Sequence, residues 1–355
     1  MTVQFGNRIV GEGQPCFITF EAGPTHDGLE SAKRLVGLAA QAGADAVKFQ
    51  MVDPDRLVAD RKMPFSYDVL IDRATGRTET IEEPLYDILC RRALTPDEWR
   101  ALKAECDRLK IAFFATAAFE DEIELLQALG CASIKIASAD INHVPLLRLA
   151  ARTGLCLQID TGNASLGEVE VAVDVIRSEG NENIIIHHCP SGYPAKAEGV
   201  NLRVIQTLRQ MFPYPVAYSD HVPGWDMDIA AVVMGASLLE KTITEDRTTR
   251  SVEHTMSLEP GDMRAFIAAI RHLERALGSP RRIMSPVEIE RRQRIRRSAH
   301  LRRDLPAGHV LALADLEFRR PGDGMPPDRI DEIVGRALTM AKTAGERLRP
   351  QDLSW

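Results

Sequence analysis

Short apolar runs alternate along the chain with longer segments whose apolar residues recur at helical spacing. The first run covers residues 16–20, and residues 29–42 follow with an apolar face of helical period that stops at Gly43. Further apolar runs begin at Ala46, Ala112, Ser133, Cys156, Ile184, Val216 and Leu238. Strands that alternate with helices predict a parallel sheet. Eight such units in 355 residues favour an α/β fold of the (β/α)8 TIM-barrel type, with an open doubly wound sheet as the alternative.

Two segments interrupt this rhythm. Residues 51–93 are mostly polar and contain proline, which indicates an insertion after the second strand. Thr95-Pro96-Asp97-Glu98 then has the pattern of a helix start, with threonine as the cap and proline in the first turn. After Gly278 the composition changes to an arginine-rich stretch. We therefore expect a barrel domain over residues 1–280, a linker over 281–297 and a small β-rich domain with glycine turns over 298–355.

Composition and charge exclude several classes of protein. The chain is 45% hydrophobic and 27% charged, which is typical of a globular protein, and its net charge of −7 offers no attraction to nucleic acid or to an anionic membrane. No apolar run approaches the ~20 residues of a membrane helix, and the first residues lack the basic and apolar regions of a signal peptide. The six cysteines include no Cys-x-x-Cys pair. We expect a reduced, cytoplasmic protein without nucleic-acid or membrane partners.

Polar side chains gather where the predicted strands end, and in a TIM barrel these positions form the active site. The candidates are Glu21, Lys48, Gln50, Thr116, Lys135, Ser138, Asp140, Asp160, His187, His188, Ser219, His221, Glu240 and Lys241. A lysine is unfavourable to bury without an anion, so Lys48 and Lys135 predict an anionic substrate whose absence leaves their charges uncompensated. Histidine and carboxylates beside them suit a divalent metal. These residues alone leave condensation, aldol cleavage and hydrolysis open.

The two adjacent histidines, His187 and His188, come at the end of one predicted strand. Side chains alternate between the two faces of a strand, so one of them must point into the barrel and the other must point outward.

The chain resembles the sialic acid synthases, including their legionaminic and pseudaminic acid relatives, over nearly its whole length. The motifs that carry the resemblance are Glu21-Ala22-Gly23-x-x-His26-Asp27-Gly28, Ala42-Gly43-Ala44-Asp45-Ala46-Val47-Lys48-Phe49-Gln50, Lys135-Ile136-Ala137-Ser138, Tyr193-Pro194, Ser219-Asp220-His221, Leu239-Glu240-Lys241 and Glu253-His254-x-x-Ser257-Leu258. The last domain, with Arg320-Pro321-Gly322-x-Gly324, looks like the antifreeze-like (SAF) domain of these enzymes.

The resemblance implies a condensation that depends on phosphoenolpyruvate (PEP). A PEP carbon attacks the aldehyde of an open-chain sugar similar to N-acetylmannosamine, a divalent metal (Mn or Mg) polarises the aldehyde, and phosphate leaves to give a nonulosonic 2-keto acid. The resemblance further implies that Arg320 reaches into the partner subunit's site, in a domain-swapped homodimer. By position, it implies PEP binding by Lys48, Thr116, Lys135, Ser138, Asp160, Ser191 and Ser219, catalysis by Glu21, Lys135 and His221, metal binding by His221 and Asp160, and sugar binding by Gln50, Tyr193, Glu253 and Arg320.

The chain departs from the family pattern at four positions of this pocket. Thr242 stands where relatives carry a second histidine ligand, and a hydroxyl binds a transition metal more weakly than imidazole does. Asp160 replaces a serine, and its charge would oppose phosphate unless it binds the metal or a lysine. Ser191 replaces an asparagine and Glu253 an aspartate. Two alternatives stay open, a barrel aldolase or lyase that uses Lys48, Lys135 or Lys241 as a Schiff base, and a non-catalytic sugar-binding paralogue.

Overall fold

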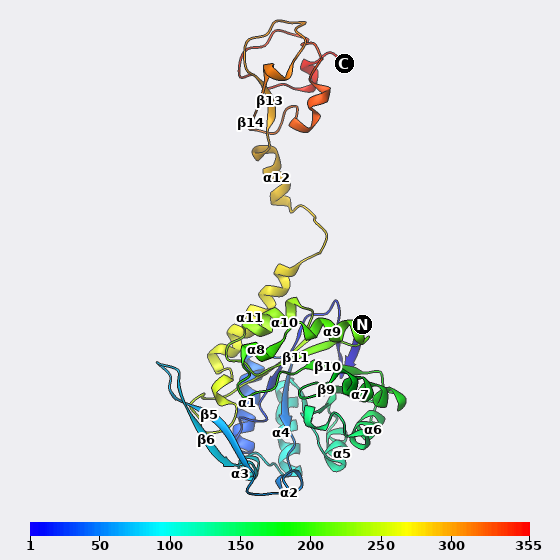
Figure 1. Cartoon of the computed structure of the whole chain (residues 1–355), viewed down its shortest axis with the longest axis vertical. Helices are drawn as coiled ribbons and strands as arrows, with labels where there is room; N and C mark the ends of the chain where they lie inside the picture. Colours follow the sequence, from blue (N-terminus) through cyan, green and yellow to red (C-terminus); the bar gives the residue numbers. More distant parts are fainter. The chain divides into compact units, whose positions relative to one another are not determined.

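The structure, a computed structural model, describes all 355 residues and contains two compact units, Met1–Gly278 and Ser279–Trp355. The first unit contains a closed barrel of eight parallel strands surrounded by helices (Figure 1). The predicted TIM barrel is therefore confirmed, and the alternative of an open sheet is wrong because the last barrel strand pairs with the first.

All eight barrel strands begin within the predicted apolar runs or beside them. They are β3 (Phe17–Glu21), β4 (Ala46–Gln50), β7 (Ala112–Thr116), β8 (Ser133–Ile136), β9 (Cys156–Asp160), β10 (Ile184–His188), β11 (Val216–Asp220) and β12 (Leu238–Thr242). Each strand pairs with the next in this order, and β12 closes the barrel on β3. Since parallel strands all end at the same rim, the polar residues at the strand ends are brought together there.

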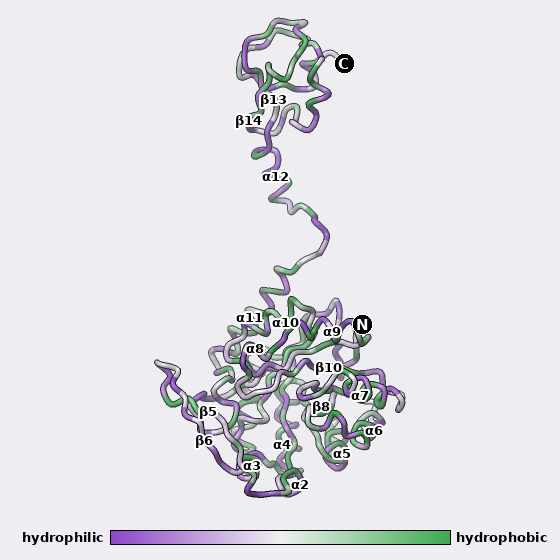
Figure 2. Tube along the Cα trace, viewed as in Figure 1, coloured by the Kyte–Doolittle hydropathy of each residue, from purple (hydrophilic) through white to green (hydrophobic).

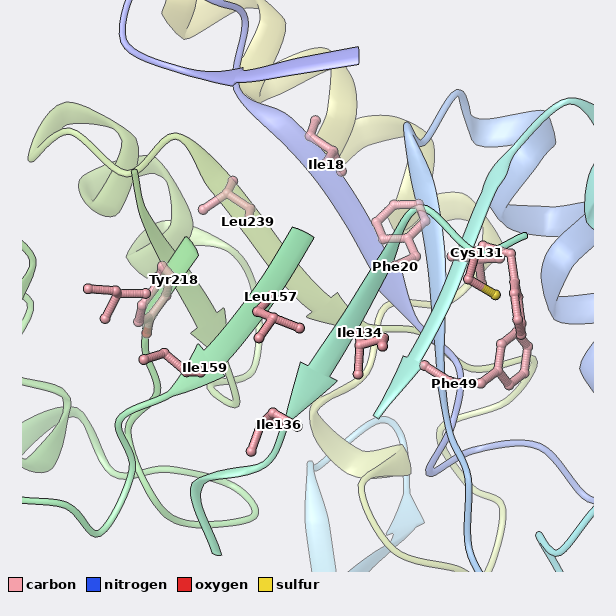
Figure 3. Packing of buried hydrophobic residues seen from close by; sticks show 14 of the residues in the cluster. Ile18, Phe20, Phe49, Cys131, Ile134, Ile136, Leu157, Ile159, Tyr218 and Leu239 are labelled. Carbon is pink, nitrogen blue, oxygen red and sulfur yellow. The ribbon is translucent and has the colours of Figure 1, made fainter. Parts of the chain in front are cut away.

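Side chains that point outward from the strands pack against the surrounding helices and form the main core. Figure 3 shows this cluster, with Ile18, Phe20, Leu157, Ile159 and Leu239 among the side chains that project from the strands. The helices are α1 (Leu29–Ala42), α4 (Pro96–Leu109), α5 (Glu120–Ala128), α6 (Val144–Arg152), α7 (Leu166–Ser178), α8 (Ala197–Val200), α9 (Val204–Met211), α10 (Asp226–Val233) and α11 (Pro260–Leu277), with the short 3-10 turns η1 (Ser138–Asp140) and η2 (His254–Met256).

The helix start predicted at Thr95 is confirmed. The backbone N–H of Glu98 donates to Oγ1 of Thr95 at 3.3 Å, and the carboxylate of Glu98 accepts from the backbone N–H of Thr95 at 2.8 Å. This reciprocal cap satisfies two of the N–H groups that the first turn of α4 leaves without an intrahelical partner.

A hairpin of β1 (Thr2–Phe5) and β2 (Arg8–Gly11) packs on the amino-terminal end of the barrel. Val3, Phe5 and Val10 of this hairpin form one buried cluster with inward-facing strand residues such as Phe17 and Phe114. The amino-terminal end of the barrel interior is therefore filled with apolar side chains, whereas the charged side chains of Glu21, Lys48 and Glu240 lie nearer the carboxyl ends of their strands.

The predicted insertion folds as two short helices and a hairpin. It contains α2 (Pro54–Leu57), β5 (Pro64–Asp72), β6 (Arg77–Pro84) and α3 (Leu85–Cys90), and the mostly polar sequence of β6 appears purple in Figure 2. Tyr67 and Val69 of β5, Ile88 of α3 and Val252 form a small buried cluster. The insertion is thereby fixed to the loop that follows β12, which is one of the loops at the carboxyl rim.

The second unit has its own buried core. Its elements are α12 (Pro286–Ile295), β13 (Ser298–Leu301), β14 (Leu316–Arg319) and the 3-10 turns η3 (Leu313–Asp315), η4 (Pro327–Glu332) and η5 (Pro350–Asp352). β13 and β14 pair antiparallel, and Leu301, Leu316 and Leu348 contribute to the core. Across both units, no helix has the length and apolar character needed to cross a membrane.

Candidate active site

A buried group of lysines and carboxylates lies inside the barrel near its carboxyl rim. Nζ of Lys48, on β4, contacts Oε2 of Glu21 on β3 and lies 2.9 Å from Oε1 of Glu240 on β12. Nζ of Lys135, on β8, lies 2.7 Å from Oε2 of the same Glu240. One carboxylate therefore bridges two ammonium groups, and all four side chains are buried.

Asp160, at the end of β9, belongs to the same group. Its Oδ1 lies 2.9 Å from Nζ of Lys135 and accepts a hydrogen bond from Oγ of Ser219 at 3.3 Å. The structure thus meets one of the two conditions under which an aspartate is compatible with a phosphate site, because Asp160 is paired with a lysine.

These contacts correct one expectation from the sequence. Lys48 and Lys135 were expected to carry uncompensated charges in the absence of a ligand, whereas both are paired with carboxylates of neighbouring strands. The barrel interior has room for long side chains from opposite strands to meet at its axis, and sequence order does not reveal which of them do so.

Burial and charge together set the ionisation of this group. Burial alone would lower the pKa of Lys48, but Glu21 and Glu240 raise it well above its ordinary value. Burial would raise the pKa of Glu240, but Lys135 and Lys48 hold it below the usual glutamate range. Burial, with Glu240 nearby, raises the pKa of Glu21. Glu240 is therefore the fixed anion of the group, and Glu21 is the member that takes up a proton more readily.

His187 and His188 point to opposite faces of β10, as predicted. Nδ1 of His187 lies 2.8 Å from Oγ of Ser219 and 3.3 Å from Nζ of Lys135 inside the barrel. Burial and Lys135 lower the pKa of His187 well below its ordinary value, so its ring is neutral. His188 points outward, where its Nε2 bonds to the carbonyl oxygen of Val200 at 2.6 Å.

Lys241 is a strand-end candidate that the structure removes from the site. It points outward from β12, where its Nζ contacts Asp220 and lies 3.6 Å from Oδ2 of Asp228 on α10. This buried cluster joins the barrel wall to a helix. Lys241 therefore has a structural role, and the Schiff-base alternative is reduced to Lys48 and Lys135.

His221 follows β11 and is held by the loop after β10. Its Nδ1 donates to the carbonyl oxygen of Pro190 at 3.2 Å, and the ring of Tyr193 lies 4.9 Å from its ring in an edge-on arrangement. Burial lowers the pKa of His221, which favours the neutral ring. With Nδ1 as the donor, Nε2 is left as the lone-pair nitrogen that a metal requires.

The predicted metal ligands do not form a complete set by themselves. Nowhere in the chain do three side chains of the histidine, cysteine, aspartate and glutamate types come together as ligands for a metal ion. His221 and Asp160 offer one nitrogen and one carboxylate. The Asp160 carboxylate suits a hard cation such as Mg²⁺ or Mn²⁺, which keeps several water ligands, and His221 would add one imidazole.

Glu253, a predicted sugar-binding residue, lies at the part of the site formed by the loop after β12. Oγ1 of Thr242 donates to its Oε2 at 3.3 Å, and its backbone has a φ of 70°, in the left-handed region that is unfavourable for glutamate. Burial and the Glu21 carboxylate raise the pKa of Glu253 to about 7. Nε2 of Gln50 donates to Glu21 at 3.4 Å, so Gln50 lies at the same part of the site.

The remaining predicted residues lie at or outside the edge of this group. Thr116 ends β7 and Ser138 begins η1, while Oγ of Ser191 donates to Asn163 at 3.0 Å in an exposed loop. Arg320 belongs to the second unit, where its Nε donates to the carbonyl oxygen of Ile295 at 2.8 Å. The predicted roles of these residues stay predictions.

One residue of this region gave no signal in the sequence. Arg92 lies in the insertion, outside every motif and every strand end, yet its side chain is only 7% exposed and its charge acts on Glu253 and Glu21. An arginine in a polar insertion has the pattern of a solvated surface residue, and only the packing of α3 against the loop after β12 brings it inside.

A closed parallel barrel with ionised groups at its carboxyl rim defines a TIM-barrel enzyme. Residues 35–282 match the model of the NeuB family, and residues 296–354 match the model of the SAF domain. The chain belongs to the NeuB family.

Named relatives and solved structures agree with this assignment. The chain is 37% identical to the N,N'-diacetyllegionaminic acid synthase of Legionella pneumophila over 345 residues, which are 95% of this chain and 94% of that protein. It is 32% identical to the human N-acetylneuraminate-9-phosphate synthase over 335 residues, 93% of this chain and 90% of that protein. The N-acetylneuraminic acid synthetase structure from Leptospira borgpetersenii matches with a TM-score of 0.71 at 30% identity, covering 82% of this chain and 94% of that one. The prediction of a carbon–carbon bond-forming enzyme of the sialic acid synthase type is confirmed.

Proposed function

We propose that the protein condenses PEP with an open-chain aldose and releases inorganic phosphate and a nonulosonic 2-keto acid. The observation that carries this proposal is the pair of buried ammonium groups, Lys48 and Lys135, held together by Glu240 at the rim of the barrel. A substrate with a phosphate and a carboxylate on adjacent atoms needs two closely spaced cations, and lysine is a common phosphate-binding residue.

The chemistry has two stages, formation of the carbon–carbon bond and replacement of phosphate by water at C2. C3 of PEP forms a bond to the aldehyde carbon of the sugar, and the aldehyde oxygen takes a proton. Water then adds to C2, its proton goes to a carboxylate, and loss of phosphate leaves the 2-keto group. Glu21 fits the role of this base because it ends β3 beside Lys48, and burial keeps its proton affinity high.

The binding residues of this proposal are those that the resemblance implies. Lys48 and Lys135 hold PEP, together with Ser219 and with the predicted Thr116, Ser138 and Ser191. Gln50, Tyr193 and Glu253 face the sugar. Asp160 is paired with Lys135 and would also help to hold a divalent cation, and either partner would offset the repulsion between its charge and the phosphate.

A divalent cation, Mg²⁺ or Mn²⁺, forms part of the proposal. His221 and Asp160 would hold it, with water and substrate oxygens completing its ligands. Bound there, the cation supplies positive charge that polarises the aldehyde. The free Nε2 of His221 and the rim position of Asp160 support this assignment.

The assembly is also proposed from the resemblance. Arg320 of one subunit would contact the sugar in the partner subunit's site, in a homodimer that exchanges its second units. The separate core of the second unit supports this arrangement, because a domain that folds by itself needs no fixed position on its own barrel.

The test is release of phosphate from PEP in the presence of candidate aldoses, with the new 2-keto acid identified by mass spectrometry. The aldolase alternative predicts that borohydride in the presence of a 2-keto acid traps a lysine. We expect no trapping, because both candidate lysines are ion-paired and therefore charged, whereas an imine forms from a neutral amine. Trapping without phosphate release would refute the proposal.

A further inference from the structure

His187 is a buried residue of the site that none of the proposed steps uses. Its ring is enclosed inside the barrel, and both ring nitrogens have partners. Nε2 lies 2.8 Å from Oε1 of Gln158, whereas Nδ1 lies 2.8 Å from Oγ of Ser219 and 3.3 Å from Nζ of Lys135. The direction of these hydrogen bonds decides what the ring can do for its neighbours.

Ser133 and Gln158 fix which ring nitrogen carries the hydrogen. Oγ of Ser133 has one hydrogen and donates it to the carbonyl oxygen of Cys156 at 2.7 Å, because a carbonyl can only accept. The same Oγ therefore accepts from Nε2 of Gln158 at 2.8 Å, which turns Oε1 of Gln158 toward His187. Nε2 of His187 donates to this oxygen. Nδ1 is left as an acceptor, because the ammonium group of Lys135 beside it can only donate.

The single hydroxyl hydrogen of Ser219 has two possible acceptors. Nδ1 of His187 lies 2.8 Å from Oγ, and Oδ1 of Asp160 lies 3.3 Å from it, which is longer than a usual hydrogen bond between two oxygens. The hydroxyl therefore donates mainly to His187, while Asp160 is held by Lys135 at 2.9 Å. In the free protein, His187 thus keeps the hydroxyl of Ser219 from being tied to a carboxylate.

Lys135 can replace Ser219 as the donor to His187 without a change of position. Its Nζ already lies 3.3 Å from Nδ1, and its three hydrogens can then reach His187, Glu240 and Asp160. The hydroxyl of Ser219 becomes free to donate to an anion, and no buried group loses its partner. A bond to the neutral ring is also easier to release than one to a carboxylate, since a charge-assisted hydrogen bond is roughly twice as strong.

We propose that His187 is a positioning residue of the PEP site, which holds the hydroxyl of Ser219 in the free protein and releases it to the PEP anion while Lys135 takes its place at Nδ1. This inference rests on the proposed function, since it assigns the hydroxyl of Ser219 to PEP. It also explains how Asp160 is compatible with this site, because its carboxylate does not withdraw the hydroxyl from the substrate.

Calorimetry with PEP alone tests this role in the full-length protein. His187→Leu leaves Asp160 as the acceptor of the Ser219 hydroxyl, so we expect affinity for PEP to fall roughly fivefold. His187→Asn places an amide oxygen near the position of Nδ1 and should restore the affinity. Both variants leave Oε1 of Gln158 without its donor, so urea unfolding should show a similar loss of stability in both. A structural role alone predicts equal changes of PEP affinity in the two variants.

His188→Leu is the matched control, because His188 is the adjacent residue but points outward and bonds to the carbonyl oxygen of Val200. It should lower stability and leave the affinity for PEP unchanged. NMR of protein with ¹⁵N-labelled histidine gives a second readout. The signal of His187, identified by its absence in His187→Asn, should show a hydrogen on Nε2 and a bare Nδ1 whose resonance shifts when PEP is added.

A hydrogen on Nδ1 of His187 in the wild-type protein would overturn the inference without any variant. Unchanged PEP affinity in His187→Leu would also overturn it, as would an equal loss in His187→Leu and His187→Asn. If PEP affinity depends on His187 as expected but no aldose supports release of phosphate, the positioning role stands and the proposed condensation fails. If the wild-type protein does not bind PEP, both fail.

Discussion

Nζ of Lys135 lies 2.7 Å from Oε2 of Glu240, and Oε1 of the same carboxylate lies 2.9 Å from Nζ of Lys48. Glu240 thus holds two cations at a fixed spacing before any substrate binds. Preorganised charge of this kind needs little rearrangement when an anion enters, which is the usual basis of electrostatic catalysis.

Replacing Glu240 with glutamine should destabilise the barrel. The change leaves two buried ammonium groups short of one counterion, and breaking a buried pair in this way costs about 3–5 kcal/mol. We expect this loss in the free energy of unfolding by urea, and we expect saturating PEP to restore part of it. Glu30→Gln, at an exposed pair with Lys33, is the control and should change stability by less than about 0.5 kcal/mol.

Lys135→Met should raise the KM for PEP strongly and also lower stability. The second effect follows from the structure, because Lys135 contacts both Glu240 and Asp160, and its removal leaves Asp160 without its lysine and Glu240 with Lys48 alone. Steady-state kinetics and thermal unfolding measure the two effects. Unchanged PEP kinetics would contradict the assignment of Lys135 to the PEP site, and a variant more stable than wild type would contradict the ion-pair geometry.

Glu253 should make stability depend on pH between about 4 and 7. Its pKa in the folded protein is about 7, above the ordinary glutamate value, so the folded state keeps a proton that the unfolded state has lost. Stability therefore falls as pH rises through this window and levels off above pH 7, by about 3 kcal/mol at most. Glu253→Gln removes this dependence, so it should match wild type near pH 4 and exceed it at pH 8 in urea unfolding. A constant difference between the two proteins at all pH values would contradict the pKa.

The proposed metal should be weakly held. With His221 and Asp160 as the only protein ligands, we expect activity to be lost on chelation and restored by millimolar magnesium or manganese rather than by zinc. Thr242→His should tighten Mn²⁺ binding measured by calorimetry, because it adds an imidazole to the inner face of β12. Full activity after exhaustive chelation, with no effect of Thr242→His on Mn²⁺ affinity, would remove the metal from the proposal.

A chain shortened to residues 1–280 should fold but lose activity. The barrel unit Met1–Gly278 has its own core, so its circular dichroism and thermal transition should persist. Activity should disappear because Arg320 is absent, and Arg320→Ala in the full chain should lower affinity for the sugar without changing the oligomeric state. A full-length monomer with full activity would refute the exchanged dimer.

The arrangement of the barrel could be predicted from the sequence because its causes are local. Each strand is a short apolar run, each helix has a periodic apolar face, and caps such as Thr95 act within one turn. Strand ends in a parallel barrel must meet at one rim, so Lys48, Lys135 and Glu21 could be placed together without coordinates.

Which of these groups touch was decided only by the tertiary structure. Lys241 is adjacent in sequence to Glu240, yet the alternation of side chains along β12 sends one outward to Asp220 and the other inward to the two lysines. Asp160 departs from the family pattern, and whether its charge opposes a bound phosphate depends on the group with which it pairs. That group is Lys135, which comes from another strand.

The sequence by itself determined the fold, the family and the residue types at the rim, since these depend on periodicity and on motifs a few residues long. Only the tertiary structure decided that the lysines are neutralised within the chain and that Arg92, from a polar insertion, is buried without a counterion. The physical reason is that ion pairing and burial depend on distances between segments far apart in the chain. The order of residues along the chain does not contain those distances, and a difference of a few ångströms decides whether a buried charge has a counterion.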